Sequence, residues 1–203
     1  MTDDTSWLTD DEMAAWVRLE AVLELLLPAL DSQLRRDSGL THFEYYALAM
    51  LSEAPDRSLQ MTTLAARTNA TLPRLSHVMR RLQSRGLVTR STSPTDGRAT
   101  IAHLTADGWA LVREAAPGHV STVRRYVFDT LAPDQVEQVA RIADAMLERL
   151  DPTGRMTSAH NLPGIGRSAP DGPGGDSLTG RGRNDQAARR TGPAPRGVRE
   201  PRV

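Results

Sequence analysis

Cysteine is absent from this sequence of 203 residues, which excludes disulfides, cysteine-ligated metal sites and thiol redox sensing. Aromatic residues make up only 4%, so leucine, valine, methionine and alanine have to form most of the core. No run approaches the ~18–20 apolar residues that a bilayer-spanning helix needs. The acidic N-terminus, residues 1–5, lacks the basic and apolar regions of a signal peptide. We therefore expect a cytoplasmic, nucleoid-associated protein with no membrane partner.

Lysine is also absent, so all 25 basic residues are arginine, and they balance 25 acidic residues to a net charge of zero. The arginines are unevenly placed. Residues 67–98 contain seven arginines and one acid, Asp96, whereas residues 1–66 contain four arginines and 12 acids. A neutral chain with one dense basic segment can present a directed positive face to a polyanion. Residues 67–98 are therefore the candidate nucleic-acid site.

Apolar residues at helical spacing predict four helices around this basic segment, at about 10–36, 42–53, 105–130 and 133–149. Pro28 predicts a kink in the first of them, and Pro117-Gly118 a kink or break in the third. After Leu150 the composition changes, because residues 151–203 hold 10 of the 15 glycines and 7 of the 13 prolines. We expect a folded domain over 1–150 and a disordered Gly/Pro/Arg-rich tail over 151–203.

Two short helices are predicted within the basic segment, at 62–68 and 72–85, with a turn at Asn69-Ala70. Thr62 and Thr71 are suitable N-caps, and Pro73 falls in the first turn of the second helix, where its missing N–H does little harm. The residues expected on its buried stripe are Leu72, Leu75, Val78, Met79 and Leu82. The opposite face presents Arg74, Ser76, His77, Arg80, Arg81 and Arg85, with no acid. Such a helix fits a DNA major groove.

A hairpin is predicted after the second helix, with strands at 87–91 and 100–104 and a turn-rich tip at 93–98. Helix, turn, helix and two-stranded wing is the order of a winged helix. Arg98 at the tip is well placed to enter a minor groove, and Asp96 is expected to orient it by an ion pair. We therefore predict a mainly α fold with a small two-stranded β wing.

These residues together resemble the MarR family (multiple antibiotic resistance regulators). The resemblance lies in Leu64-Ala65, Leu82, Arg85-Gly86-Leu87-Val88, Arg90, Pro94, Asp96-Gly97-Arg98, Leu104-Thr105 and Gly108. It covers about residues 10–150. Leu72 is a departure, because a polar residue is common at that position in the family. The resemblance implies a ligand-responsive transcription regulator, a repressor, that binds a pseudopalindromic operator.

The resemblance also implies a homodimer, with dimerisation helices at 10–36 and 105–150 flanking a winged helix-turn-helix lobe at 40–104. Helix 72–85 would enter the major groove and Arg98 the minor groove. The residues expected at the DNA are Thr71, Pro73, Arg74, Ser76, His77, Arg80, Arg81, Asp96 and Arg98. A small-molecule effector would bind between the dimerisation helices and the lobe. The candidates on those elements are Trp16, His42, Tyr45, Tyr46, Trp109 and His119.

Two alternatives remain open at this point. One is a winged-helix ligand- or protein-binding module without DNA binding, which the seven arginines in 67–98 disfavour. The other is a metal-sensing winged-helix regulator, although the five histidines share no i, i+3 or i, i+4 spacing. No nucleophile elbow, phosphate loop or metal triad indicates an enzyme, and no metal or cofactor is expected. The arginines of the tail could bind DNA phosphates without sequence preference, or the tail could be a spacer.

Overall fold

The computed structural model describes residues 6–156, so the predicted tail lies outside it from residue 157 onward. The first helix, α1 (Asp10–Ser38), begins after Thr9, whose hydroxyl accepts the Glu12 N–H while the Glu12 carboxylate accepts the Thr9 N–H. It ends where Gly39 takes a left-handed φ of 64°. Pro28 lies inside the helix without ending it, as predicted.

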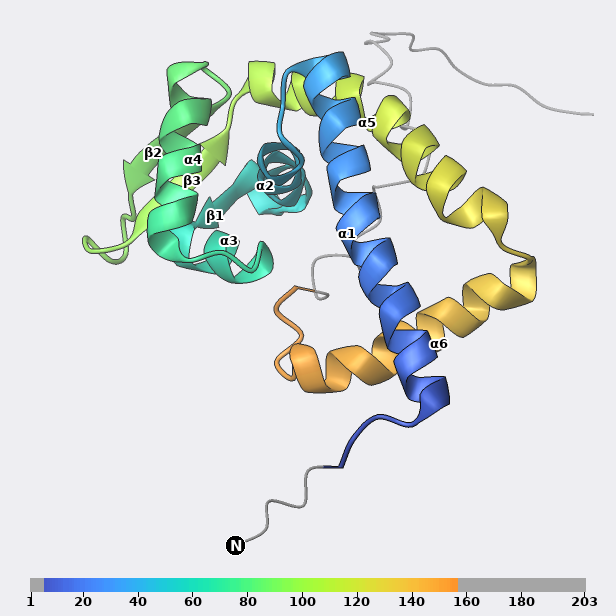
Figure 1. The fold of residues 1–203 in the computed structure, drawn as a ribbon. Helices are drawn as coiled ribbons and strands as arrows, with labels where there is room; N and C mark the ends of the chain where they lie inside the picture. Colours follow the sequence, from blue (N-terminus) through green and yellow to red (C-terminus); the bar gives the residue numbers. More distant parts are fainter. Residues whose placement is uncertain (1–5, 157–203) are drawn as a thin grey trace, which may run out of the picture. The chain divides into compact units, whose positions relative to one another are not determined.

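Helix α2 (His42–Glu53) forms the centre of the domain (Figure 1), in contact with α1, α3, α5 and the sheet. A second capping box starts it, because the Thr41 hydroxyl accepts the Glu44 N–H at 3.1 Å and the Glu44 carboxylate accepts the Thr41 N–H at 2.8 Å. Seven of its 12 residues are buried, so the helix is surrounded by other elements. The short helix η1 (Pro55–Arg57) follows it.

The helix-turn-helix consists of α3 (Met61–Arg67) and α4 (Leu72–Ser84), both within a residue of the predicted bounds. Asn69 makes the turn between them with a left-handed φ of 47°, which asparagine tolerates better than most residues. The expectation that Thr62 caps α3 is wrong. Gln60 holds the N-cap position, without a side-chain hydrogen bond, because the helix starts one residue earlier, directly after a strand.

The sheet has three strands where two were predicted. Strands β2 (Val88–Thr92) and β3 (Thr100–Leu104) form the wing, pairing Val88 with Leu104. The additional strand β1 (Ser58–Gln60) pairs antiparallel with the other edge of β3, giving the order β1-β3-β2. The sequence could not predict β1, because three residues are too few for an alternating pattern and its pairing partner lies more than 40 residues away.

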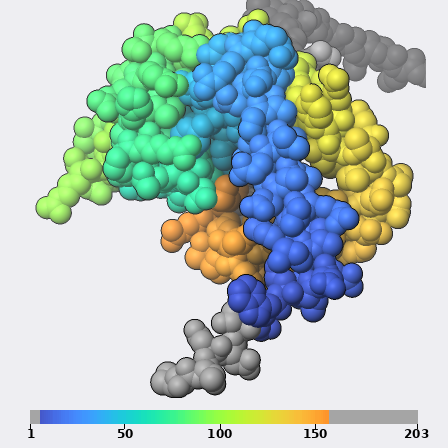
Figure 2. Space-filling view, in the orientation of Figure 1, coloured from blue at the N-terminus to red at the C-terminus, as the bar shows by residue number. Residues whose placement is uncertain are grey.

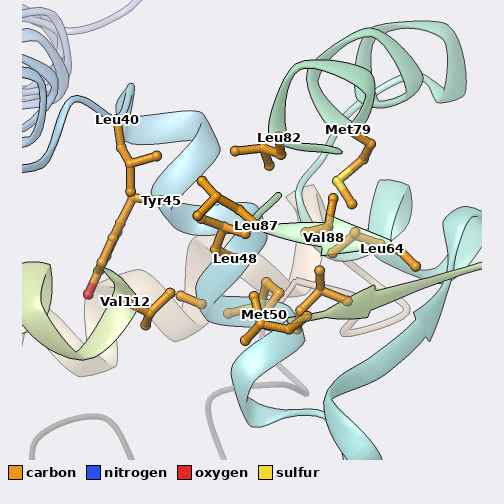
Figure 3. Packing of buried hydrophobic residues seen from close by; sticks show 14 of the residues in the cluster. Leu40, Tyr45, Leu48, Met50, Leu64, Met79, Leu82, Leu87, Val88 and Val112 are labelled. Atoms are coloured by element: carbon orange, nitrogen blue, oxygen red, sulfur yellow. The ribbon is translucent and has the colours of Figure 1, made fainter. Parts of the chain in front are cut away.

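The core of the domain lies between α2, α3, α4 and the sheet. Figure 3 shows Leu48 and Met50 of α2 beside Met79 and Leu82 of α4 and Val88 of β2. All five side chains are 0–1% exposed. This continuous apolar centre fixes the backbone of α4, so the outward face of α4 has a defined orientation on the lobe.

Helix α5 (Ala106–Tyr126) packs along α1 and continues through Pro117, so the break considered at Pro117-Gly118 does not occur. A side chain at Gly118 would bring its Cβ to 3.1 Å from Nε2 of Gln33, and the glycine therefore lets the two helices approach. After η2 (Phe128–Thr130), α6 (Pro133–Leu150) buries none of its residues. None of the helices within residues 6–156 has the length and apolar character needed to cross a bilayer.

Candidate nucleic-acid interface

Helix α4 separates its apolar and cationic residues as predicted, with one exception. The Thr71 hydroxyl accepts the Arg74 N–H and caps the helix, and Pro73 lies in the first turn. Leu75, Met79 and Leu82 are buried, and Val78 packs partly against the core. Leu72 was expected on the buried stripe, but its side chain is 43% exposed. As the first residue of α4, it lies beyond the core on the side that faces the wing.

The outward face of α4 exposes Arg74, His77, Arg80 and Arg81, with Ser76 half-buried beside them. Two of these arginines contact the first turn of α2. The Arg74 guanidinium lies 4.5 Å from the centre of the Phe43 ring, a cation–π contact. The Arg81 guanidinium donates to Oε1 of Glu44 through Nε at 3.2 Å and Nη2 at 2.5 Å. The sequence did not indicate either contact, because the partners are more than 30 residues apart.

Glu44 is a buried acid at the back of the cationic face, with 3% of its side chain exposed. Burial alone would raise the pKa of its carboxyl. The Thr41 N–H, the Arg81 guanidinium and the Thr41 hydroxyl outweigh burial and lower the Glu44 pKa below its ordinary value. The carboxylate is therefore charged at neutral pH and neutralises part of the Arg81 charge.

The wing tip is held by its own hydrogen bonds. The buried Ser93 hydroxyl accepts the N–H groups of Thr95 and Asp96, and Ser93 N–H donates to the Ala99 carbonyl at 2.8 Å. Asp96 was expected to form an ion pair with Arg98. Instead, its Oδ1 accepts the backbone N–H of Arg98 at 3.0 Å, and the Arg98 guanidinium forms no ion pair within residues 6–156. Figure 2 shows the wing projecting from the lobe, so this guanidinium can reach a ligand.

The residues of the family motif meet at the base of the wing. The Thr105 hydroxyl donates to the Gly86 carbonyl at 2.7 Å, and the Thr105 N–H donates to the Leu87 carbonyl at 3.1 Å. A Cβ on Gly108 would lie 2.1 Å from the Leu87 carbonyl oxygen, so only glycine permits this approach. The motif therefore fixes the wing against the first turn of α5.

His103 links all three strands of the sheet. Its Nδ1 lies 2.7 Å from the Ser58 hydroxyl of β1, and its Nε2 lies 2.8 Å from the Ser91 hydroxyl of β2. Because the Ser58 hydroxyl donates to the Asp56 carbonyl, it accepts from Nδ1–H, and Nε2 then accepts from Ser91 in the neutral imidazole. These bonds join the wing to β1.

A hollow lies between the start of α4 and the wing, and we call it the wing hollow. Its volume is ≈ 150 Å³. The residues that line it are Met61, Thr62, Leu72, Ser76, Arg90, Arg98, Ala99 and Thr100. Two arginines and three hydroxyl-bearing residues are therefore among its lining residues, and no acid is.

The candidate effector residues are only partly brought together. Across α2 and α5, the ring of His119 lies 4.7 Å from that of Tyr45 and 6.0 Å from that of His42, and His42 stacks on Tyr46 at 6.4 Å. We call these four side chains the ring cluster. Burial lowers the pKa of His42 and of His119, and nearby Asp31 partly opposes this for His42. Burial also raises the pKa of Tyr45 to about 12.

Neither tryptophan belongs to this cluster. Trp109 precedes His119 by ten residues, about 15 Å along α5, and its ring contacts the Arg57 guanidinium at 4.4 Å. Trp16 precedes Asp31 by 15 residues on α1, about 22 Å, and Asp31 is where α1 meets α2, accepting the His42 N–H at 2.8 Å. Residues 6–156 contain no group of three or more histidine and acidic side chains arranged to hold a metal ion.

Comparison with known proteins gives consistent relatives. Residues 38–99 match the family model described as "MarR family". Sco3205, a MarR family transcriptional regulator from Streptomyces coelicolor solved in complex with DNA, is 41% identical, with a TM-score of 0.71 over 75% of this chain and 95% of that one. AbsC, a MarR family transcriptional regulator from the same organism, is 36% identical, with a TM-score of 0.70 over 73% of this chain and 100% of its own.

A sequence relative of known role extends the comparison. The HTH-type transcriptional repressor Rv2887 of Mycobacterium tuberculosis is 34% identical over 132 residues, which is 64% of this chain and 91% of the repressor. The solved structures share the mainly helical fold with its small antiparallel sheet. The chain therefore belongs to the MarR family of DNA-binding transcription regulators, which are not enzymes.

Proposed function

We propose that the chain is a homodimeric repressor that acts in the cytoplasm and binds a pseudopalindromic operator, with α4 in the major groove and Arg98 in the adjacent minor groove. The supporting observation is the cationic face that combines α4 with the wing, where Asp96 is the one acid in residues 71–104. Arg74, His77 and Arg80 are exposed on it, and the Arg98 guanidinium is free of intramolecular ion pairs within residues 6–156. A solved relative, Sco3205, carries DNA.

Selection of bound duplexes from random DNA, followed by footprinting, tests this proposal. Two-fold symmetry predicts two half-sites about 10 bp apart. Arg98→Ala should weaken binding of the selected operator at physiological salt by about 10-fold, because the variant loses charge-assisted bonds. The matched control is Arg141→Ala, which removes the same charge from exposed α6. Equal binding by Arg98→Ala and wild type would remove the wing from the interface.

The homodimer is proposed from apolar surface that the single chain leaves exposed. Residues 42–55% exposed on α6 include Val139, Ile142 and Met146, and Trp16 and Leu23 on α1 are about half exposed. Exposed apolar side chains on two helices suit a second copy of the chain, since burying apolar area drives association. Light scattering should give twice the monomer mass, and Ile142→Glu should reduce it to the monomer mass. A wild-type monomer at micromolar concentration would contradict the proposal.

The ring cluster is the proposed contact for a small-molecule effector. Its support is the gathering of four rings between α2 and α5 and the buried Nδ1 of His119, which has no hydrogen-bond partner within residues 6–156. Small organic acids and neutral aromatics should be screened for release of the operator. An effector of this site loses its effect in His119→Phe and keeps it in Trp16→Phe. Release unchanged in His119→Phe would place the effector elsewhere.

A further inference from the structure

The wing hollow combines donors for an anion with a position between two DNA-reading elements. Arg90, Arg98 and the hydroxyls of Thr62, Ser76 and Thr100 line it. Its remaining lining residues, Met61, Leu72 and Ala99, are uncharged and apolar. A space of ≈ 150 Å³ compares with roughly 30 Å³ for one water, so a phosphate group and residual water fit in it.

The position of the hollow follows from the arrangement of α4 and the wing. If α4 lies in a major groove and Arg98 in the neighbouring minor groove, one sugar–phosphate strand separates the two elements. That strand has to cross the surface between the start of α4 and the wing. The hollow is at this crossing, because its lining comes from α3, α4 and both wing strands.

We propose that the wing hollow binds one backbone phosphate of the operator and that Arg90 is its main ligand, a role that rests on the proposed DNA docking. Thr62, Ser76 and Thr100 supply hydroxyl donors to the same phosphate. Arg90 was noted in the sequence only as a motif residue, and nothing in its spacing indicated a ligand role.

Arg90 is held in place before any DNA binds. Its backbone is paired with Ala102 of β3, and its Nε donates to Oε1 of Gln83 on α4 at 2.7 Å. The side chain is half-buried. Its two terminal nitrogens form no hydrogen bond or ion pair within residues 6–156. An arginine that is oriented through Nε, with both terminal nitrogens unused, matches the bidentate geometry that phosphate oxygens accept.

The test uses the selected operator with single neutral methylphosphonates placed in turn along one half-site. For wild type, one position at the crossing strand should weaken binding about 10-fold, the loss expected for charge-assisted hydrogen bonds. In Arg90→Ala the same methylphosphonate should change binding less than about 2-fold, because its partner is already absent. Arg90→Ala should also reduce the slope of log K against log salt by about 1.8 for the dimer, at 0.9 for each lost phosphate contact.

Control variants separate this site from the rest of the interface. Arg74→Ala, on the exposed face of α4 and outside the lining of the hollow, should weaken binding but keep the 10-fold methylphosphonate effect. Gln83→Ala should give an intermediate loss because Arg90 loses its anchor. Circular dichroism melting checks that each variant folds. If Arg90→Ala unfolds, Arg90→Gln replaces it in the same methylphosphonate measurements. If the loss of binding caused by Arg90→Ala simply added to the loss caused by the methylphosphonate at every position, the phosphate proposal would be overturned. The proposed function would still stand in that case if the protein bound a specific sequence and Arg98→Ala weakened that binding. Absence of any bound sequence would overturn both.

Inorganic phosphate offers the same oxygens as the DNA backbone and forms a second arm. At matched ionic strength, phosphate buffer should compete with the operator more than chloride for wild type and no more than chloride for Arg90→Ala. If phosphate competed with the operator but no methylphosphonate position depended on Arg90, the hollow would be a site for free phosphate only. That result would overturn the assignment to DNA.

Discussion

The pair between Arg81 and Glu44 joins α4 to the first turn of α2. Removing either partner should lower the free energy of unfolding, and the size of that loss should depend on whether the other partner is present. Arg81→Ala leaves a carboxylate that is 3% exposed with only the Thr41 donors. A hydrogen bond to a charged group contributes about 1.5–3 kcal/mol. Because the Arg81 side chain is 52% exposed, solvent screens the pair, and we expect a loss of about 1–2 kcal/mol.

Glu44→Gln is the milder change. Glutamine serves at the N3 position of a capping box, so α2 keeps its start, and the cost of burying a charge disappears with the charge. We expect a loss of about 0.5–1.5 kcal/mol. The double variant should lose less than the sum of the two, with a coupling free energy of about 1 kcal/mol.

Urea unfolding at one fixed protein concentration measures this cycle, since a dimer's stability depends on concentration. The pH supplies an internal control. The Glu44 pKa is lowered in the folded state from 4.5, so its contribution is present above about pH 4.5 and is lost as the pH falls through the lower folded value. Losses that add within about 0.3 kcal/mol at pH 7 would show that the pair contributes nothing, as many exposed pairs do.

Three further expectations concern the wing base and the ring cluster. Gly108→Ala should cost about 3 kcal/mol or more, measured by thermal melting, because its Cβ would collide with the Leu87 carbonyl; a melting temperature near wild type would contradict this contact. Burial lowers the pKa of His119 below its ordinary value of 6.5 in the folded protein. Its contribution to folding stability is therefore present above pH 6.5 and is lost as the pH falls below that value. His119→Phe should therefore flatten the fall in stability between pH 7 and 5 by at most about 1.4 kcal/mol per pH unit, and an unchanged pH profile would count against the buried neutral imidazole. His103→Ala should reduce the free energy of operator binding by more than it reduces the free energy of unfolding, because it releases β1 and the wing from each other. If the variant bound the operator as tightly as wild type, the wing would hold its position without His103.

The helices could be predicted from the sequence because their signals are local. Thr9 and Glu12, which lie within four residues of each other, predict the start of α1, and Thr71 and Pro73 predict the start of α4. The cationic face of α4 follows from the 3.6-residue period alone. Local signals fail at Leu72, because the period assigned it to the core while its place in the first turn leaves it exposed.

The unpredicted features all depend on contacts between distant residues. β1 forms only because β3 offers it an edge, with Ser58 opposite His103. The ion pair predicted between Asp96 and Arg98 does not form, because the Asp96 carboxylate accepts the nearer backbone N–H of Arg98 instead. No sequence pattern linked Glu44 to Arg81, and only the fold places this acid behind the arginine.

The number of arginines in the sequence and the number that the structure leaves available predict different salt dependences for operator binding. Seven arginines in residues 67–98 would suggest 14 phosphate contacts for a dimer and a log–log slope near about −13. Three of them are less available to DNA. Arg81 pairs with Glu44, Arg85 donates to the Gly39 carbonyl at 3.1 Å, and one terminal nitrogen of Arg67 is buried without a hydrogen-bond partner within residues 6–156.

The four arginines that remain for phosphates or bases are Arg74, Arg80, Arg90 and Arg98. Eight contacts for a dimer give a slope of about −7. Titration of operator affinity between 50 and 300 mM salt distinguishes the two values, and Glu44→Gln should steepen the slope by releasing Arg81. A wild-type slope near −13 would mean that DNA draws the engaged arginines away from their partners, and the lobe would then have to rearrange on binding.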